Sequence, residues 1–485
     1  MLKVISASNF FILSINLLCI LSLDFDLFSG LKDTCQRIFI FIYKLYFIDK
    51  LKVKKMKTLN YLNTSEFINE IKKNNLSTNI IFISSLILPF SFFLGPAIME
   101  PLIFLICISY LYIVIAKKEK IPFNAIIIFF LSFYIFLIIS SLLSNFILIS
   151  LKSSLFSIRF AILTFAIIYI SKNSKFFLKI FFISSFLSIA LLLLSGLSQF
   201  LFSPDHWVIS KLINNKSSTI NTVVTGFFGE EKKLGSFISR FSPLVIGIYF
   251  FISNKEMKKK IDNALVFFSP IFLIGFFTSE RMAMFYLSLT LFFLLFLSIK
   301  NNKKNIYKLI IFLMIPFILF FTQINKFHET VENSYNQLFV ENKINYYSKQ
   351  HEAFAITSIE LFKKNPFFGV GPNNYRRECG SIKLKYLENN CSTHPHNIFF
   401  QLVSETGGLG VFYYFIINLF FFYKIIKFLF AKKDNELELF LLLPIFYYVN
   451  PFFPSGNFFN NWYATIGLIS LPFYIYLTNK KYSAK

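Results

Sequence analysis

Residues 153–170 read SSLFSIRFAILTFAIIYI, an apolar run interrupted by a single charged residue, Arg159. A helix needs about 20 mostly apolar residues to cross the hydrocarbon core of a bilayer, and this run is nearly that long. A second such run, YLSLTLFFLLFLSIK, occupies residues 286–300. Because 55% of the 485 residues are hydrophobic and only 15% are charged, a soluble domain could not bury so much apolar surface. The sequence therefore predicts an all-α polytopic membrane protein.

Basic residues are in strong excess, with 49 Lys and Arg against 25 Asp and Glu. The lysines cluster in short loops between apolar runs, such as KKEK at 117–120 and NKEMKKK at 254–260. Short basic loops stay on the cytoplasmic side of a membrane. The charge therefore indicates topology and contact with membrane lipids, and we expect no nucleic-acid partner.

With these loops placed inside, the apolar runs predict about twelve transmembrane helices, with both chain ends in the cytoplasm. The largest outer segment, residues 324–396, falls between the ninth and tenth helices and contains a predicted helix, YSKQHEAFAITSIELF. On that helix we expect His351 to lie on a solvated face; the alternative is that it lines the site. The predicted spans are 79–95, 101–115, 123–146, 154–171, 179–202, 237–253, 263–277, 282–299, 306–323, 408–428, 437–452 and 460–478.

The N-terminal region differs from the rest. Residues 1–55 hold two apolar stretches broken by charges, and Met56 then opens a polar segment. We interpret 1–55 as an extension upstream of the true start and 56–78 as a cytoplasmic lead-in; the alternative is one more helical pair, which leaves the topology unchanged. The remaining divisions are helices one to nine at 79–323, the periplasmic loop at 324–396, and the last three helices with a cytoplasmic tail at 397–485.

Three polar segments fall on the predicted outer side. They are FFGEEKKLGSFISRFSP (227–243), FTSERMAM (277–284), and the large loop with NPFFGVGPNNYRREC (365–379) followed by STHPHN (392–397). Each charged residue, taken alone, is as readily a solvated loop residue as a functional one. Their common placement on one side of the membrane favours a site.

GVGPNNYR followed by HPHNIFFQLVSETGGLG resembles the O-antigen ligase and polymerase superfamily of bacterial envelope glycosyltransferases, over roughly residues 150–425. The resemblance implies a GT-C-like membrane fold in the bacterial inner membrane. It also implies a metal-independent, inverting glycan transfer from a polyprenyl diphosphate on the periplasmic face, without a cofactor. In that family a Gly-x-Gly turn, here Gly369 and Gly371, and a His-Asn pair, here His396 and Asn397, close the large loop.

Such a transfer needs cations for the leaving diphosphate. Arginine holds phosphate oxygens with its planar fork, and the candidates are Arg281, Arg240 and Arg159. Arg159 lies within a span, where a charge usually faces a cavity or an oppositely charged partner; snorkelling to the headgroups is an equal alternative. Glu280, beside Arg281, is a candidate supporting residue.

The same transfer needs a base for the acceptor hydroxyl, and histidine suits that role because its pKa lies near neutrality. His396 is the first candidate, since it adjoins Asn397 and matches the family position; His394 is the second. A His-x-His pair can also bind zinc, but a catalytic zinc usually has three protein ligands, and no recognisable spacing supplies the third.

The donor would be a polyprenyl-diphosphate-linked glycan. The acceptor would be the lipid A core for a ligase, or a second lipid-linked glycan for a polymerase, and the sequence does not separate these. A lipid-linked sugar flippase or other transporter is the alternative class, which predicts repeated halves and broken paired helices; a structural membrane subunit predicts no clustering of Arg and His on one face.

Two of the five cysteines, Cys379 and Cys391, share the large outer loop. In an oxidising compartment such a pair is a good disulfide candidate. Closing a loop of this length contributes roughly 3 kcal/mol in the chain-entropy model. The bridge would tie the Gly-x-Gly turn to the stretch carrying His396, and the alternative is two unrelated free thiols.

Overall fold

The computed structural model describes residues 64–119, 121, 125–202, 223–302, 332, 335–340, 343–384, 390–430 and 436–483. The chain divides into two compact units, Met1–Lys72 with Ser198–Thr222 and Lys73–Leu197 with Val223–Lys485. The second unit contains nearly all described residues and the whole of the site discussed below. The predicted N-terminal extension at 1–55 and the predicted ninth span at 306–323 lie outside the described residues.

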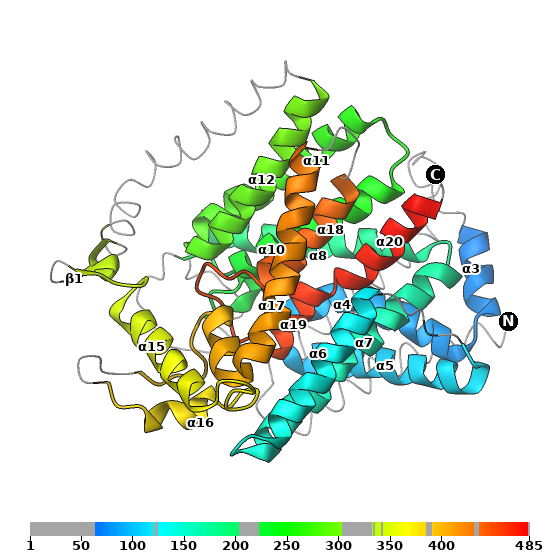
Figure 1. Cartoon of the computed structure of the whole chain (residues 1–485). Helices are drawn as coiled ribbons and strands as arrows, with labels where there is room; N and C mark the ends of the chain where they lie inside the picture. Colours follow the sequence, from blue (N-terminus) through cyan, green and yellow to red (C-terminus); the bar gives the residue numbers. More distant parts are fainter. Residues whose placement is uncertain are drawn as a thin grey trace. The chain divides into compact units, whose positions relative to one another are not determined.

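Nine helices in the described part of the chain are long and apolar enough to cross a membrane, which confirms the predicted all-α polytopic membrane protein (Figure 1). In hydrocarbon the backbone has no water to bind, so each span satisfies its own N–H and C=O groups as a helix. The nine are α4 (Leu76–Leu94), α5 (Pro96–Lys117), α6 (Ala125–Leu142), α7 (Ile147–Asn173), α8 (Phe177–Phe202), α10 (Leu234–Ile252), α11 (Met257–Phe277), α12 (Arg281–Asn301) and α17 (Ile398–Phe430).

Shorter elements lie between and after these spans. The large loop contains the predicted helix, α15, together with a two-stranded antiparallel ribbon and a four-residue helix. The short elements are α3 (Thr64–Lys73), η2 (Gly226–Phe228), β1 (Phe339–Val340), β2 (Lys343–Ile344), α15 (Lys349–Lys364), α16 (Tyr375–Glu378), η4 (Cys379–Ser381), α18 (Glu436–Tyr448), α19 (Asn461–Leu468) and α20 (Leu471–Ser483).

The last two predicted spans differ from continuous helices. Helix α18 has 13 residues, which rise only about 20 Å, whereas the hydrocarbon core is about 30 Å thick. The stretch predicted as the twelfth span consists of α19 and α20, separated at Ile469 and Ser470. The count of twelve therefore stays a prediction.

Helix α10 is the most buried of the nine spans, with 78% of its apolar window inside the protein. It packs against α11, α12 and α18 (Figure 1). The rings of Phe237 and Phe241 stack 5.0 Å apart, and Phe92 of α4 packs against both. A helix that is apolar on all sides is buried on all sides, so the one charged side chain of α10, Arg240, is carried into the interior.

Helix α17 is broken at Gly407, whose φ of 62° and ψ of −165° are not helical. The part after the break coincides with the predicted span 408–428 and exposes large apolar side chains such as Leu419. The part before the break buries Gln401, Ser404 and Glu405. The helix begins ten residues earlier than the predicted span, because its first turns mix polar and apolar residues that are buried in the protein.

Candidate functional site

A cavity of about 1320 Å³ lies in the larger unit. Side chains of α5, α6, α7 and α10 form one side of it, which we call the helix wall. Side chains of α15, α16 and residues 393–396 form another part of the lining, which we call the loop wall. Residues of the segment 454–463 also line the cavity. The predicted Arg159, Arg240, His394 and His396 all line this one cavity.

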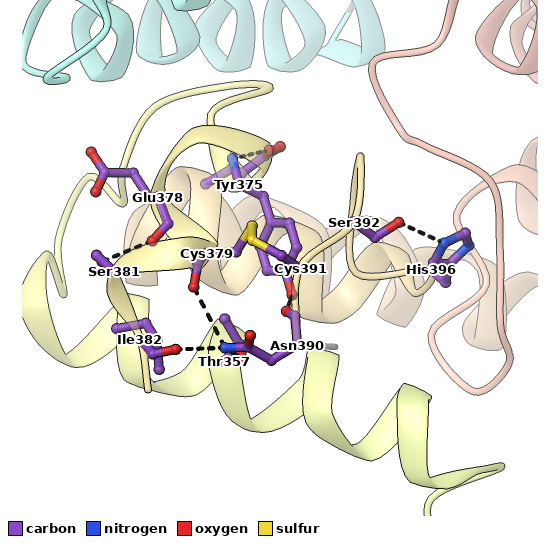
Figure 2. Close-up of a disulfide and its surroundings, with 11 residues drawn as sticks. Thr357, Tyr375, Glu378, Cys379, Ser381, Ile382, Asn390, Cys391, Ser392 and His396 are labelled. Carbon is purple, nitrogen blue, oxygen red and sulfur yellow. Dashed lines mark hydrogen bonds between the residues drawn. A yellow bond between two sulfur atoms is a disulfide. The ribbon is translucent and has the colours of Figure 1, made fainter. Parts of the chain in front are cut away.

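Three of the five histidines meet on the loop wall. The rings of His394 and His396 lie 4.2 Å apart between centroids, and His351 of α15 lies 6.1 Å from His396. His396 Nε2 is 3.1 Å from the Ser392 hydroxyl, an arrangement visible in Figure 2. His351 lines the cavity, so the structure agrees with the alternative that it lines the site and not with the expected solvated helix face.

The block has an unusual backbone. His396 has φ of 56°, a left-handed conformation that is uncommon outside glycine and costs free energy. The conformation is held from both sides: the His396 carbonyl accepts a hydrogen bond of 2.7 Å from the Ser455 N–H, and its ring stacks on Phe354 of α15 at 5.4 Å. Backbone strain maintained in this way is frequent at functional sites.

Burial sets the protonation state of the three histidines. Desolvation, followed by the nearby His351, lowers the pKa of His396 from 6.5. Desolvation, followed by His396, lowers the pKa of His394 to about 3. Desolvation and then Arg281 lower the pKa of His351. All three rings are therefore neutral near pH 7 and can accept a proton, but a pKa near 3 makes His394 a weak base.

Asn397 anchors the block. Its side-chain oxygen accepts from the Phe400 N–H at 3.2 Å, which caps the start of α17. Its Nδ2 donates to the Tyr346 hydroxyl at 3.1 Å and to the Phe453 carbonyl at 3.2 Å. The Asn397 side chain thus joins α17, the large loop and the segment after α18, which gives the predicted supporting residue a positioning role.

The Gly-x-Gly turn pairs with the broken end of α17. The N–H of Val370 donates to the Ser404 carbonyl at 2.9 Å, and that of Gly371 donates to the Glu405 carbonyl at 3.0 Å. Gly369 has φ of 68°, and a Cβ there would lie 2.4 Å from the Glu405 backbone. Only glycine permits both the conformation and the approach.

The predicted disulfide is present: Cys379 and Cys391 are bonded, with 12 residues of separation (Figure 2). Asn390, beside Cys391, donates from Nδ2 to the Ile382 carbonyl at 2.7 Å and to the Thr357 hydroxyl of α15 at 3.2 Å. The bridge therefore closes a small loop that is clamped to α15, the helix whose Phe354 stacks on His396.

Arg240 projects from the helix wall. Its guanidinium lies 4.9 Å from the ring centroids of both Tyr286 and Tyr463 and donates to the Tyr463 hydroxyl at 3.2 Å. The side chain is only 3% exposed, and its Nε has no hydrogen-bond partner among the described residues. A buried guanidinium with an unused donor beside a cavity is suited to receive an anion.

Arg159 also lines the cavity, so its charge is not simply snorkelling to headgroups. It forms an ion pair of 3.4 Å with Glu100 of α5 and a hydrogen bond with Asn461. The guanidinium lies 4.9 Å from the ring centroid of Phe160. Part of its positive charge is therefore balanced by Glu100 already.

Arg281 and Glu280 lie outside the residues that line the cavity. Arg281 is exposed and donates to Gln337 at 3.2 Å, although its charge reaches His351. Glu280 accepts from the N–H groups of Gly235 at 2.7 Å and Ser236 at 2.9 Å, so it caps the start of α10. Burial raises the pKa of Glu280, in spite of these hydrogen bonds.

Several lining residues were not singled out in the sequence. Asn457 accepts from Gln401 at 2.8 Å, and Gln401 also donates to the buried Glu405 at 2.9 Å. The sequence signal that could have found Asn457 is the stretch NPFFPSGNFFNN at 450–461, where Pro, Gly and Asn interrupt the apolar pattern and predict a loop. In the described ranges, no group of three or more His, Cys, Asp and Glu side chains is placed to hold a metal ion.

Residues 265–415 match the family model described as O-antigen ligase. This range contains Arg281, the Gly-x-Gly turn and the histidine block, whereas Arg159 and Arg240 precede it. The match confirms the resemblance to the O-antigen ligase and polymerase superfamily and indicates a glycosyltransferase-like enzyme of polysaccharide assembly. No curated protein matches the chain.

Proposed function

Because residues 265–415 place the chain in the O-antigen ligase and polymerase superfamily, we propose that it transfers a glycan from a polyprenyl diphosphate carrier to a sugar hydroxyl. The reaction would take place on the periplasmic face of the bacterial inner membrane. One observation carries the proposal. The neutral His394 and His396 and the buried Arg240 line the same cavity, whose volume is about 1320 Å³.

In the proposed reaction His396 removes the proton from the acceptor hydroxyl. The freed oxygen attacks the anomeric carbon of the donor sugar, and the bond from that carbon to the diphosphate oxygen breaks. The configuration inverts because attack and departure occur on opposite faces in a single displacement. The proton remains on His396 until water removes it, and the polyprenyl diphosphate leaves with one more negative charge.

The cations of the helix wall would stabilise that leaving charge. Arg240 offers an unused donor, and Arg159 adds a partly balanced charge. Arg281 would add a third positive charge from outside the lining, where it is exposed and its charge acts on His351. Preorganised positive groups act strongly where water is excluded. With guanidinium groups in this role the reaction needs no divalent ion, so we expect full activity after exhaustive chelation.

The apolar part of the helix wall suits the carrier lipid. It consists of aromatic and aliphatic side chains of α6 and α7, among them Phe133, Leu137 and Phe156. Phe156 is 59% exposed in the protein, as expected of a side chain that borders the acyl chains. The polyprenyl chain would leave the cavity along this surface.

A direct transfer assay tests the proposal. Purified protein is incubated with the host's lipid-linked glycan and an acceptor fraction, and the product is followed by gel mobility. Failure of the protein to move glycan from the carrier to either acceptor would contradict the proposal. A deletion strain then separates the two subclasses, because accumulated lipid-linked long chains indicate a ligase and single attached units without long chains indicate a polymerase.

Reporter fusions test the compartment. Fusions at residues 258, 302 and 433 should report the cytoplasm, and fusions at 220 and 380 the periplasm. A cytoplasmic signal at 380 would place the histidine block on the wrong side for a lipid-linked donor and would refute the proposed location.

A further inference from the structure

Two arginines of the loop wall have no assigned role. Arg376 and Arg377 of α16 both line the cavity and are exposed to it. Neither forms an ion pair within the described ranges. Arg376 donates to the Asn373 side chain at 2.8 Å, and that oxygen also accepts from Asn457 at 3.3 Å. The guanidinium is thus oriented by neutral amides.

Helix α16 is partly exposed, but hydrogen bonds and a disulfide fix its position. The carboxylate of Glu378 accepts from Asn145, in the turn between α6 and α7, at 2.9 Å. The N–H of Tyr375 donates to the buried Glu405 at 2.9 Å, and Cys379 follows directly with its disulfide. Arg376 and Arg377 are therefore presented by a fixed support. Neither forms an ion pair with a described residue, although the charge of Arg376 also acts on the buried Glu405.

The charge of the cavity exceeds what one diphosphate would balance. Among the described residues, six Lys and Arg side chains and one carboxylate, that of Glu100, line the cavity. Glu100 pairs with Arg159, and Glu231, which lies outside the lining, pairs with Lys233. Four of the six belong to α7 and the start of α10: Lys152, Arg159, Lys233 and Arg240. The other two, on α16, belong to the loop that carries the histidines, and the charge of Arg376 acts on His394.

We propose that Arg376 and Arg377 form a second anion subsite, which binds a carboxylate or phosphate group on the acceptor glycan. That the bound group belongs to the acceptor rests on the proposed function. The subsite adjoins the histidine block, where the acceptor hydroxyl would lose its proton. An anionic substituent held by two arginines near that hydroxyl orients the sugar for attack. The enzyme would then select acidic over neutral acceptors.

Binding measurements on the full-length purified protein test this subsite. Farnesyl diphosphate is added to saturation first, so that it occupies the cations of the helix wall. Glucuronate, glucose 6-phosphate and glucose are then titrated separately. We expect at least one acidic sugar to bind roughly tenfold more tightly than glucose, because charge-assisted hydrogen bonds are the stronger kind.

The variants Arg376→Gln and Arg377→Gln should abolish this preference and leave the affinity for farnesyl diphosphate unchanged. Lys383→Gln is the matched control, since it removes an exposed cation of the same loop that does not line the cavity, and it should retain the preference. Preference for glucuronate would indicate a carboxylate, and preference for glucose 6-phosphate a phosphate.

Equal affinity of the parent protein for all three sugars would overturn the inference. So would variants that lose farnesyl diphosphate to the same extent as acidic sugars, because the two arginines would then belong to the diphosphate site. If the parent protein prefers acidic sugars but does not bind farnesyl diphosphate, the subsite stands and the proposed donor is wrong.

Discussion

The helix wall and the loop wall of the cavity place their functional side chains by different means. On the helix wall, Arg240 and Arg159 are positioned by the spans that carry them, and packing of apolar helices fixes both. On the loop wall, His396 is positioned by contacts between segments distant in the chain. Ser455 donates to its carbonyl, Phe354 stacks on its ring, and the disulfide closes a loop that is hydrogen-bonded to α15 through Asn390. A charge inside a span is visible in the sequence, whereas a geometry made of long-range contacts is not.

The largest effect should come from the loop wall. We expect His396→Ala to lower kcat by roughly 10²–10⁴-fold, the usual contribution of a positioned base, with protein level and membrane insertion unchanged. His394→Ala should be milder, because its pKa of about 3 makes it a poor proton acceptor. Single-turnover assays with purified variants measure both, and near-parental activity of His396→Ala would remove the base assignment.

Next in size is the helix wall. Arg240→Lys keeps the charge but loses the fork, and we expect roughly 10- to 100-fold weaker donor binding, the range for a lost charged hydrogen bond. Arg281→Lys should cost less, because Arg281 lies outside the lining of the cavity. Farnesyl diphosphate titrations rank the two. If Arg281→Lys proved the more damaging, the carrier would bind at the rim rather than beside Arg240.

Removing the disulfide should disturb the loop wall and leave the helix wall intact. Replacing Cys379 and Cys391 together by Ser removes roughly 3 kcal/mol of loop stabilisation in the chain-entropy model. Activity should fall several-fold and proteolysis of the loop should accelerate, while farnesyl diphosphate affinity stays constant. A parallel loss of diphosphate affinity would show that the walls are coupled. Thiol alkylation of the parent protein should label neither cysteine before reduction.

The smallest effect concerns pH. Because burial lowers the pKa of His396 below 6.5, the base is still neutral at pH 6.5. The acid limb of kcat should therefore lie below pH 6.5. His394 binds a proton near 6.5 when unfolded but only near 3 when folded. Its contribution to stability is complete above pH 6.5 and declines towards pH 3. Hydrogen exchange of the loop across this range measures it, and an acid limb above 6.5 would contradict the burial.

Much of the fold follows from composition. The runs that predict α4 to α12 end within a few residues of the observed helices, because lipid-facing spans must be continuous and apolar. The start of α17 could not be found in this way, since Gln401 and Glu405 face the loop instead of lipid. The division of the twelfth predicted span at Ile469 and Ser470 leaves the apolar pattern uninterrupted, and its one local signal is Pro472, the second residue of α20.

The site was only partly predictable. Scarcity made His394 and His396 visible among five histidines, and an isolated charge in an apolar run made Arg159 visible. Their meeting with Asn457 and Tyr463 depends on contacts across more than fifty residues, for which a local pattern carries no information. The position of Arg281 between two apolar runs predicted a role in the site, yet its guanidinium donates to Gln337.

The pairing of Val370 and Gly371 with Ser404 and Glu405 has a consequence for the order in which the protein is made. The disulfide partners and the Gly-x-Gly turn emerge from the ribosome before α17, but their backbone partners do not. Ser455, whose N–H donates to the His396 carbonyl, is synthesised later still. A chain arrested after α17 would therefore lack part of the cavity lining, so maturation of this site ends only when the segment after α18 has been synthesised.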